Sequence, residues 1–258
     1  MNKNFTFPNF HKYHNIPNML KDILLKNKYY STQQDYLNLA EYIIKHNFIN
    51  DPHLNQQFSL NGINKLIRLL TLDEEYHIFS RTLKYKQHFP ETPPFFTLSP
   101  HYCPHCYSEL SQARSIPLSN TLHIDIALNP TLSFPWNFER LANSLSTIGS
   151  NISQPFNYQE SNHFNNTLIF PINLLIIGNG YHSSFSGIYD STAILPAHHV
   201  LDISPLYCDI YFDGIVYRHT KCHHILESPL NKSAGIIYEI GRLLTEQNLN
   251  LLSLYESK

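Results

Sequence analysis

The densest group of chemistry-bearing residues follows an apolar run, residues 172–177, that is interrupted only by Asn173. The residues after this run are Gly178, Asn179, Gly180, His182, Ser183 and Ser184. A buried strand that ends in a Gly-Asn-Gly turn can expose polar groups to a ligand. Its glycines let backbone N–H groups approach an anion, which the serine hydroxyls can also hydrogen-bond. The alternative is a tight structural turn in which His182 satisfies buried backbone groups.

A second candidate site begins at Cys103-Pro104-His105-Cys106. Two thiolates at this spacing can chelate one zinc ion, and a closed tetrahedral site needs two more ligands. The ligands that we predict are the four cysteines of the chain, Cys103, Cys106, Cys208 and Cys222. Such a zinc ion would be structural and would fasten this segment to a later hairpin. One alternative is a redox pair, although the strand and helix that flank such a pair in a thioredoxin are not expected here. The other alternative is that the cysteines bind no metal.

Charged residues offer a third kind of chemistry. Four carboxylates lie near the turn in the expected fold, namely Asp125, Glu139, Asp190 and Asp202. A metal-dependent nuclease needs at least two of them on one cation, but no nuclease motif joins them, so surface or capping roles are favoured. Arg140 and Arg242 are the candidate charge donors to an anion. The spacing of Glu239 and Arg242 also predicts an ion pair on a helix surface.

Composition excludes several classes of protein. The formal net charge of −2 over 258 residues provides no global basic field that would hold nucleic acid by counterion release. The longest apolar runs fall far short of the roughly 20 residues that a membrane span needs. The N-terminal residues lack the apolar core of a signal peptide, and only four cysteines are present. We therefore expect a cytoplasmic protein with reduced thiols.

The first part of the chain reads as helical. Apolar spacing predicts helices over 19–30, from Ser31 or Thr32 to about His46, over 61–72 and, more weakly, over 73–85. Prolines then crowd residues 89–104. We therefore expect a helical region over 1–88 and a proline-rich linker with the Cys-x-x-Cys pair over 89–118.

The remainder, 119–258, is predicted to be an α+β domain with a small mixed sheet. Strands are expected over 121–128, 168–177, 206–212 and 215–219, the last two joined by an Asp213-Gly214 hairpin turn. Asn137 is expected to cap a helix that Gly149 closes, and an amphipathic helix should span 234–248.

The order of these parts resembles the ParB/sulfiredoxin-like domain over about Thr121 to Pro196. The motifs that carry the resemblance are Ser146-Thr147-Ile148-Gly149 at the helix end and Asn179-Gly180-Tyr181-His182-Ser183 after the second strand. The same turn also resembles an uncharacterised bacterial family. The ParB/sulfiredoxin resemblance implies that nucleotide phosphates are held at the turn. Two departures weaken it, because Ser183 stands at the family's arginine position and Tyr181 replaces the sulfiredoxin cysteine.

The resulting hypothesis is a nucleotide- or nucleic-acid-handling protein, with nucleotide hydrolysis, nuclease action or phosphotransfer as the reaction. The turn, Arg140 and Arg242 would bind the ligand, which magnesium would accompany. His182 would act as the acid or base, since imidazole titrates near neutrality. The alternative is a non-enzymatic accessory protein of a mobile-element or phage-defence system. Its helical N-terminal region would then dock a protein partner.

Overall fold

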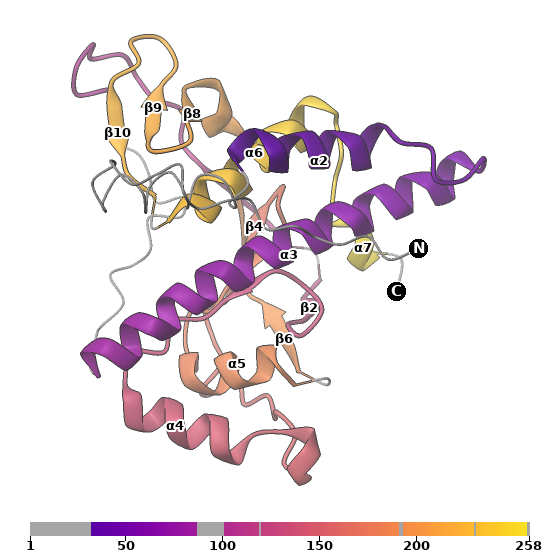
Figure 1. Ribbon diagram of the computed structural model, residues 1–258, viewed down its shortest axis with the longest axis vertical. Helices are drawn as coiled ribbons and strands as arrows, with labels where there is room; N and C mark the ends of the chain where they lie inside the picture. The colour runs from indigo at the N-terminus through magenta and orange to yellow at the C-terminus, as the bar shows by residue number, and fades with distance from the viewer. Residues whose placement is uncertain (1–31, 87–100, 119, 191–192, 230, 257–258) are drawn as a thin grey trace, which may run out of the picture.

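The computed structural model describes residues 32–86, 101–118, 120–190, 193–229 and 231–256. Within these ranges the chain has an α+β fold (Figure 1). The α-helices are α2 (Gln33–Lys45), α3 (Pro52–Tyr85), α4 (Phe138–Thr147), α5 (Tyr181–Ile188), α6 (Lys232–Glu246) and α7 (Ser253–Glu256). Two short 3-10 helices are η2 (Ser150–Ile152) and η3 (Ser204–Cys208).

The strands form three sheets. They are β1 (Arg114–Ile116), β2 (Leu122–Asp125), β3 (Thr131–Leu132), β4 (Thr167–Phe170), β5 (Leu174–Ile176), β6 (Ile194–Ala197), β7 (His199–Asp202), β8 (Ile210–Phe212), β9 (Tyr217–His219) and β10 (Ile225–Glu227). A five-stranded mixed sheet has the order β1-β7-β4-β5-β3. An antiparallel sheet of three strands, β10-β9-β8, and a β2-β6 pair complete the set.

Helix α3 spans the molecule. It is one continuous helix from Pro52 to Tyr85, so the predicted division at residue 72 is wrong. Asp51 caps its start, and no glycine or proline interrupts the chain near residue 72. Buried side chains also continue past that point, from Thr71 to Thr82, so packing supports the helix throughout its length. The capping box of Thr32 and Asp35 confirms the start of α2, whereas the helix expected over 19–30 lies outside the described residues.

Two apolar clusters form the core. The larger one joins α3, through Ile63 and Ile67, to Ile236, Ile237 and Ile240 of α6. The smaller one lies around Leu168, Leu175, Val200 and Ile188 in the five-stranded sheet and α5. Figure 1 shows α2 and α6 on one side of α3, with α4 and α5 on the other. The α3 helix is therefore the common support of both ends of the molecule.

The strand expected over 168–177 is two strands. β4 and β5 pair antiparallel, with Leu168 opposite Leu175, so the chain reverses between them. The reversal contains Pro171 and Asn173, whose φ of 51° lies in the left-handed region that asparagine tolerates. The sequence predicts one continuous strand because β4 and β5 are both buried and apolar, and the turn between them is short.

The C-terminal expectations fare better. β8 and β9 are antiparallel on either side of Asp213-Gly214, as predicted, although Leu206 belongs to η3 and not to a strand. Asn137 caps α4, and α6 lies within two residues of its expected bounds. None of the described helices combines the length and apolar character needed to cross a membrane.

Candidate functional sites: an open pocket and a Cys/His cluster

A pocket of about 570 Å³ lies between α4 and the start of α5. Five of the predicted ligand residues line it: Arg140, Asn179, Gly180, His182 and Ser183. The other lining residues are Trp136, Glu139, Asn143, Ser144, Asn162 and Tyr181. The structure thus brings most of the predicted turn together with one of the two predicted arginines.

Helix α5 begins in this pocket without a side-chain cap. Its N-cap, Gly180, has a φ of 74°, and no side chain accepts a hydrogen bond from the first turn. Within the described parts of the chain, the backbone N–H groups of Tyr181, His182 and Ser183 have no acceptor. By contrast, side chains cap α2, α3, α4 and α6. The start of α5 therefore offers unpaired donors and the positive end of the helix dipole.

Glycine is required at position 180. Besides its positive φ, a Cβ atom there would lie 2.4 Å from the His163 ring and 2.6 Å from the Asn162 carbonyl oxygen. The loop that carries Asn162 and His163 therefore packs directly against the turn.

His182 is buried, with 9% of its surface exposed, and its ring faces the pocket. Its Nε2 accepts a hydrogen bond from the Asn137 backbone N–H at 3.1 Å, which leaves the proton of the neutral ring on Nδ1. Burial, and then the positive charge of Arg140, lower the pKa of His182 from 6.5 to about 4. At neutral pH His182 is thus an uncharged hydrogen-bond donor through Nδ1. The backbone bond to Asn137 is also what the structural alternative expected of this residue.

Ser183 interacts with a second histidine that the sequence did not single out. His163 Nε2 lies 2.8 Å from Ser183 Oγ, while the Gln159 backbone N–H donates to His163 Nδ1. His163 Nδ1 also lies 3.2 Å from the Gln159 carbonyl oxygen, and the Ser183 hydroxyl donates to the Gly180 carbonyl at 3.0 Å. Ser183 is thus held between the His163 ring and the Gly180 carbonyl.

Arg140 supplies the positive charge. The residue is exposed in the first turn of α4, and its guanidinium lies 5.7 Å from the centre of the Trp136 ring. Among the described residues, no carboxylate pairs with it. Glu139 also lines the pocket, so the charge around it is mixed.

Two residues of the predicted turn do not line the pocket. The Gly178 N–H donates to Asn166 Oδ1 at 3.1 Å, and a Cβ atom at Gly178 would lie 2.1 Å from the Asn165 carbonyl oxygen. Ser184 is fully buried, and its Oγ has no hydrogen-bond partner. Ser184 therefore supports the turn from beneath, and neither Gly178 nor Ser184 contributes to the lining of the pocket.

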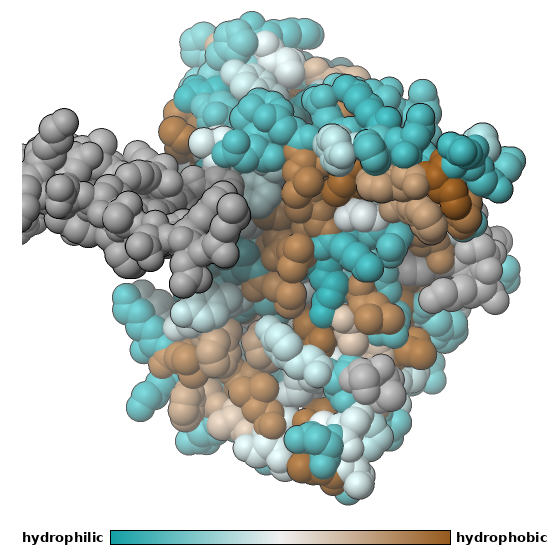
Figure 2. All heavy atoms as spheres, turned by 45° about the vertical axis from the view of Figure 1, so that its right-hand side comes forward, coloured by the Kyte–Doolittle hydropathy of each residue, from teal (hydrophilic) through white to brown (hydrophobic). Residues whose placement is uncertain are grey.

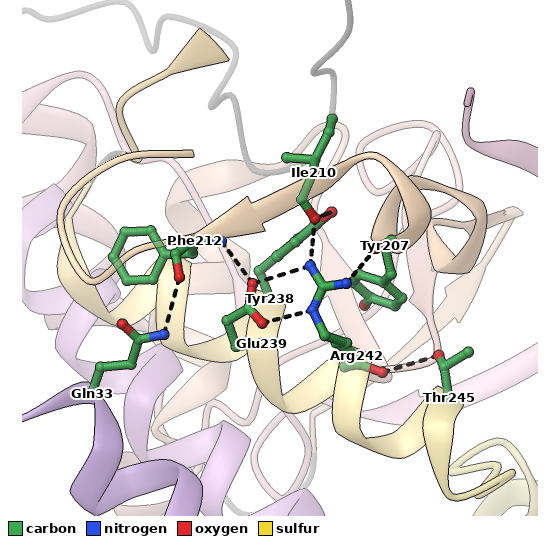
Figure 3. A network of polar contacts seen from close by, with 9 residues as sticks. Gln33, Tyr207, Ile210, Phe212, Tyr238, Glu239, Arg242 and Thr245 are labelled. Atoms are coloured by element: carbon green, nitrogen blue, oxygen red, sulfur yellow. Dashed lines mark hydrogen bonds and ion pairs between the residues drawn. The ribbon is translucent and has the colours of Figure 1, made fainter. Parts of the chain in front are cut away.

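Arg242, the second predicted arginine, belongs to a separate network (Figure 3). It pairs with Glu239 at 2.8 Å and donates to the carbonyls of Tyr207 and Ile210. Burial opposes its charge, but the hydrogen bond and ion pair with Glu239 outweigh this and raise the pKa of Arg242. The ion pair forms at the predicted spacing, but it is largely buried and does not lie on a helix surface as expected. The proposed ligand contact has no support, since Arg242 ties α6 to η3 and β8.

The four candidate carboxylates are dispersed. Asp125 accepts from the N–H groups after β2, Asp190 from Phe156 and Asp202 from Arg114. Glu139 stands alone at the pocket. Within the described residues they form no group that could hold a cation. The capping interpretation therefore fits these residues better than a nuclease centre does.

A Cys/His cluster that could hold a metal ion lies elsewhere in the fold. The ligand atoms of Cys103, Cys106, His219 and Cys222 all lie within 4.8 Å of one another. Cys103 Sγ is 3.5 Å from Cys222 Sγ, and His219 Nδ1 is 3.4 Å from Cys106 Sγ and 3.1 Å from Cys222 Sγ. Three of the four predicted ligands are therefore together.

Cys208 is not part of this cluster; it is exposed at the end of η3, and His219 takes the fourth position. The missed signal is His219-Thr220-Lys221-Cys222, a His-x-x-Cys pair with the same spacing as the first pair. This histidine, fully buried at the end of β9, was not among the predicted ligands.

The fold and sites define an α+β protein with an open polar pocket between α4 and α5 and a candidate metal cluster. The chain belongs to a family of unknown function, DUF6710, whose model matches residues 12–251. This match agrees with the expected resemblance to an uncharacterised family. It gives no support to the resemblance to the ParB/sulfiredoxin-like domain. No curated protein and no solved structure matches the chain.

Proposed function

We propose that this protein binds a phosphate-bearing ligand, a nucleotide in particular, in the pocket between α4 and α5. The observation that carries the proposal is the uncapped start of α5 within that pocket. Three backbone N–H groups without acceptors, together with a helix dipole, favour a phosphate group at this place.

Side chains around the helix start support an anionic ligand. Arg140 brings an unpaired guanidinium to the pocket, and such a group can grip two phosphate oxygens at once. His182 adds a donor through Nδ1, and Asn179 adds an amide. Arg140 here takes the place of the arginine that is missing at Ser183.

The size and aromatic lining of the pocket favour a nucleotide over a bare phosphate. A volume of about 570 Å³ falls within the roughly 300–1,000 Å³ usual for ligand pockets. Trp136 is half-buried in the lining, where its indole ring lies beside the Arg140 guanidinium and the His182 ring, so a base would stack next to these two groups. We assign His182 a binding role, because its accepting nitrogen is already used by Asn137.

The test is a thermal-shift series with pyrophosphate, ATP, CTP and GTP, each with and without Mg²⁺. A ligand at 100 times its Kd should raise the free energy of unfolding by about 2.7 kcal/mol. Arg140→Gln should cost about 1.5–3 kcal/mol of binding free energy, the usual range for a charged hydrogen bond. Lys65→Gln is the matched control, because it removes one exposed positive charge outside the pocket. Absence of any shift, or equal shifts in both variants, would contradict the proposal.

A second candidate function is the non-enzymatic interaction protein. Leu69, Tyr76 and Leu83, spaced by seven on α3, are 66%, 63% and 43% exposed. Residues with this spacing lie on one face of a helix. Figure 2 shows that apolar areas reach the surface between polar ones on the face that it presents. Under this alternative, cross-linking should trap a specific complex with a protein partner. Leu69→Ser combined with Tyr76→Ser should abolish that complex, whereas Arg140→Gln should preserve it.

A further inference from the structure

We propose that the Cys/His cluster is a structural zinc site, in which Cys103, Cys106, His219 and Cys222 bind one zinc ion. The proposal is independent of the function of the pocket. Its first support is that the two ligand pairs lie in turns with matching backbone hydrogen bonds. The Tyr107 N–H donates to the Cys103 carbonyl, and the His223 N–H donates to the His219 carbonyl, both at 2.9 Å.

The match extends on both sides of the turns. The Cys103 N–H donates to the Ser108 carbonyl, as the His219 N–H does to the His224 carbonyl. In each case the residue before the first ligand pairs antiparallel with the residue after that acceptor, namely Tyr102 with Glu109 and Arg218 with Ile225.

The residue after each ligand pair adopts the left-handed conformation, with φ of 58° at Tyr107 and 57° at His223. Neither is glycine, so both turns adopt a conformation that most side chains disfavour. Two segments far apart in the sequence therefore build the same turn, each with its two ligands turned toward the other pair. A single ion that takes two ligands from each turn accounts for this arrangement.

The distances within the cluster suit zinc. Typical bond lengths of about 2.3 Å to sulfur and about 2.0–2.1 Å to nitrogen give tetrahedral edges of roughly 3.8 Å between sulfurs and 3.6 Å from sulfur to nitrogen. The corresponding distances here are 3.5 Å for Cys103 to Cys222, 3.4 Å for Cys106 to His219 and 3.1 Å for Cys222 to His219, and no two ligand atoms lie more than 4.8 Å apart. Three thiolates and one imidazole form a donor set that zinc prefers over magnesium or calcium.

Ser108 fixes the orientation of the histidine. His219 directs Nδ1 at the sulfurs, and its Nε2 lies 3.3 Å from Ser108 Oγ. With Nδ1 on a metal, Nε2 carries the proton and donates it to that hydroxyl, as metal-binding histidines commonly do. Ser108 belongs to the first turn and His219 to the second, so this bond also links the two.

The role of such an ion follows from what it joins. Residues 101–110, which follow α3 in sequence, would be fastened to the β8–β10 sheet, where the Ser111 N–H already bonds Asp209 at 2.8 Å. Four protein ligands leave no open position for a substrate, so the site is structural and contributes to folding.

Metal analysis of the full-length protein tests the proposal. Protein purified without added chelator should carry about one zinc ion per chain, as a single four-ligand site requires. Cys222→Ser should lose the zinc, whereas Cys208→Ser, which removes the one cysteine outside the cluster, should keep it. Co²⁺ exchanged into the wild type should give the thiolate charge-transfer and intense visible bands of tetrahedral cobalt.

A second measurement on the wild type covers the case in which Cys222→Ser does not fold. Without chelator, a thiol reagent should modify Cys208 rapidly and the other three slowly; with chelator, all four should react. Three results would overturn the proposal: no zinc in the wild type, equal zinc in the wild type and a folded Cys222→Ser variant, or a disulfide between Cys103 and Cys222 in place of a metal.

Discussion

The β8–β10 sheet, beside the Cys/His cluster, and helices α4 and α5, which flank the pocket, lie toward opposite ends of the long axis of the molecule, with α3 between them (Figure 1). In the cluster, side chains supply every ligand atom, and Cys103 and His219 are fully buried. In the pocket, the backbone N–H groups at the start of α5 are central, and the side chains around them range from exposed Arg140 to buried His182. The first site depends on residue identity, whereas the second depends on backbone conformation, above all at Gly180.

The largest effect should follow removal of metal from the cluster. The two ligand pairs close a long loop, and closing a loop of about 100 residues is worth about 4–5 kcal/mol. We therefore expect chelation to lower the free energy of unfolding by several kcal/mol. Hydrogen exchange should speed up at residues 101–110 and 217–227, and the thermal shift from a pocket ligand should persist. If chelation instead first removed the hydrogen-exchange protection of α4 and α5, the stability of the pocket would depend on the metal cluster.

The substitution Gly180→Ala should affect the pocket and leave the metal cluster intact. The Cβ atom would meet the His163 ring and strain the backbone at a φ of 74°, so the start of α5 must move and ligand binding should be abolished. Gly214→Ala is the matched control, since its φ is 98° and it lies in the β8–β9 turn. Both variants should melt at lower temperature, but only Gly180→Ala should lose the shift from ligand, and neither should lose zinc. A ligand shift that survives in Gly180→Ala would disprove the role of the helix start.

A smaller change sharpens the cluster side of the comparison. Ser108→Ala removes the hydroxyl that faces His219 Nε2, and losing such a partner typically weakens metal binding about 10- to 100-fold. Competition with a chromophoric chelator measures this, with Ser111→Ala as a nearby hydroxyl control, because only the backbone of Ser111 is bonded to Asp209. Identical zinc affinities in the two variants would show that the Ser108 hydroxyl does not support metal binding by His219.

The smallest expected effect concerns pH at the pocket. Folding lowers the pKa of His182 from 6.5 to about 4. Between pH 6.5 and pH 4 the histidine is therefore protonated in the unfolded chain and neutral in the folded chain. Stability from this residue is therefore complete above pH 6.5 and is lost as pH falls toward 4. Since metal-binding thiolates also gain protons in acid, the measurement is the difference between wild type and His182→Asn in the same buffers. A steeper loss of stability in His182→Asn would contradict the assignment.

The sequence predicted local features well where one residue decides them. Thr32 and Asn137 cap the expected helices, and the cysteine spacing located half of the metal cluster. The Gly178–Ser184 turn was found, but its burial was not: α5 begins at Tyr181, and Ser184 in its first turn is fully buried.

Features that depend on tertiary packing were missed. His219 joins the three predicted cysteines only because β9 brings it to residues 101–110, which no local pattern encodes. His163 reaches Ser183 across a polar loop, and Arg242 is drawn into a network of carbonyls instead of a ligand site. In each case a side chain's partner is fixed by long-range contacts, while its type and spacing fit more than one role.

The matched turns also bear on how the chain is made. Roughly 110 residues separate the two ligand pairs, so at about 5–20 residues per second a ribosome delivers the second pair many seconds after the first. During that interval Cys103 and Cys106 can hold an ion only with outside ligands, such as water or small thiols. Completion of the centre thus waits for β9 and β10, which places the loading of metal near the end of synthesis and ties it to the formation of the last sheet.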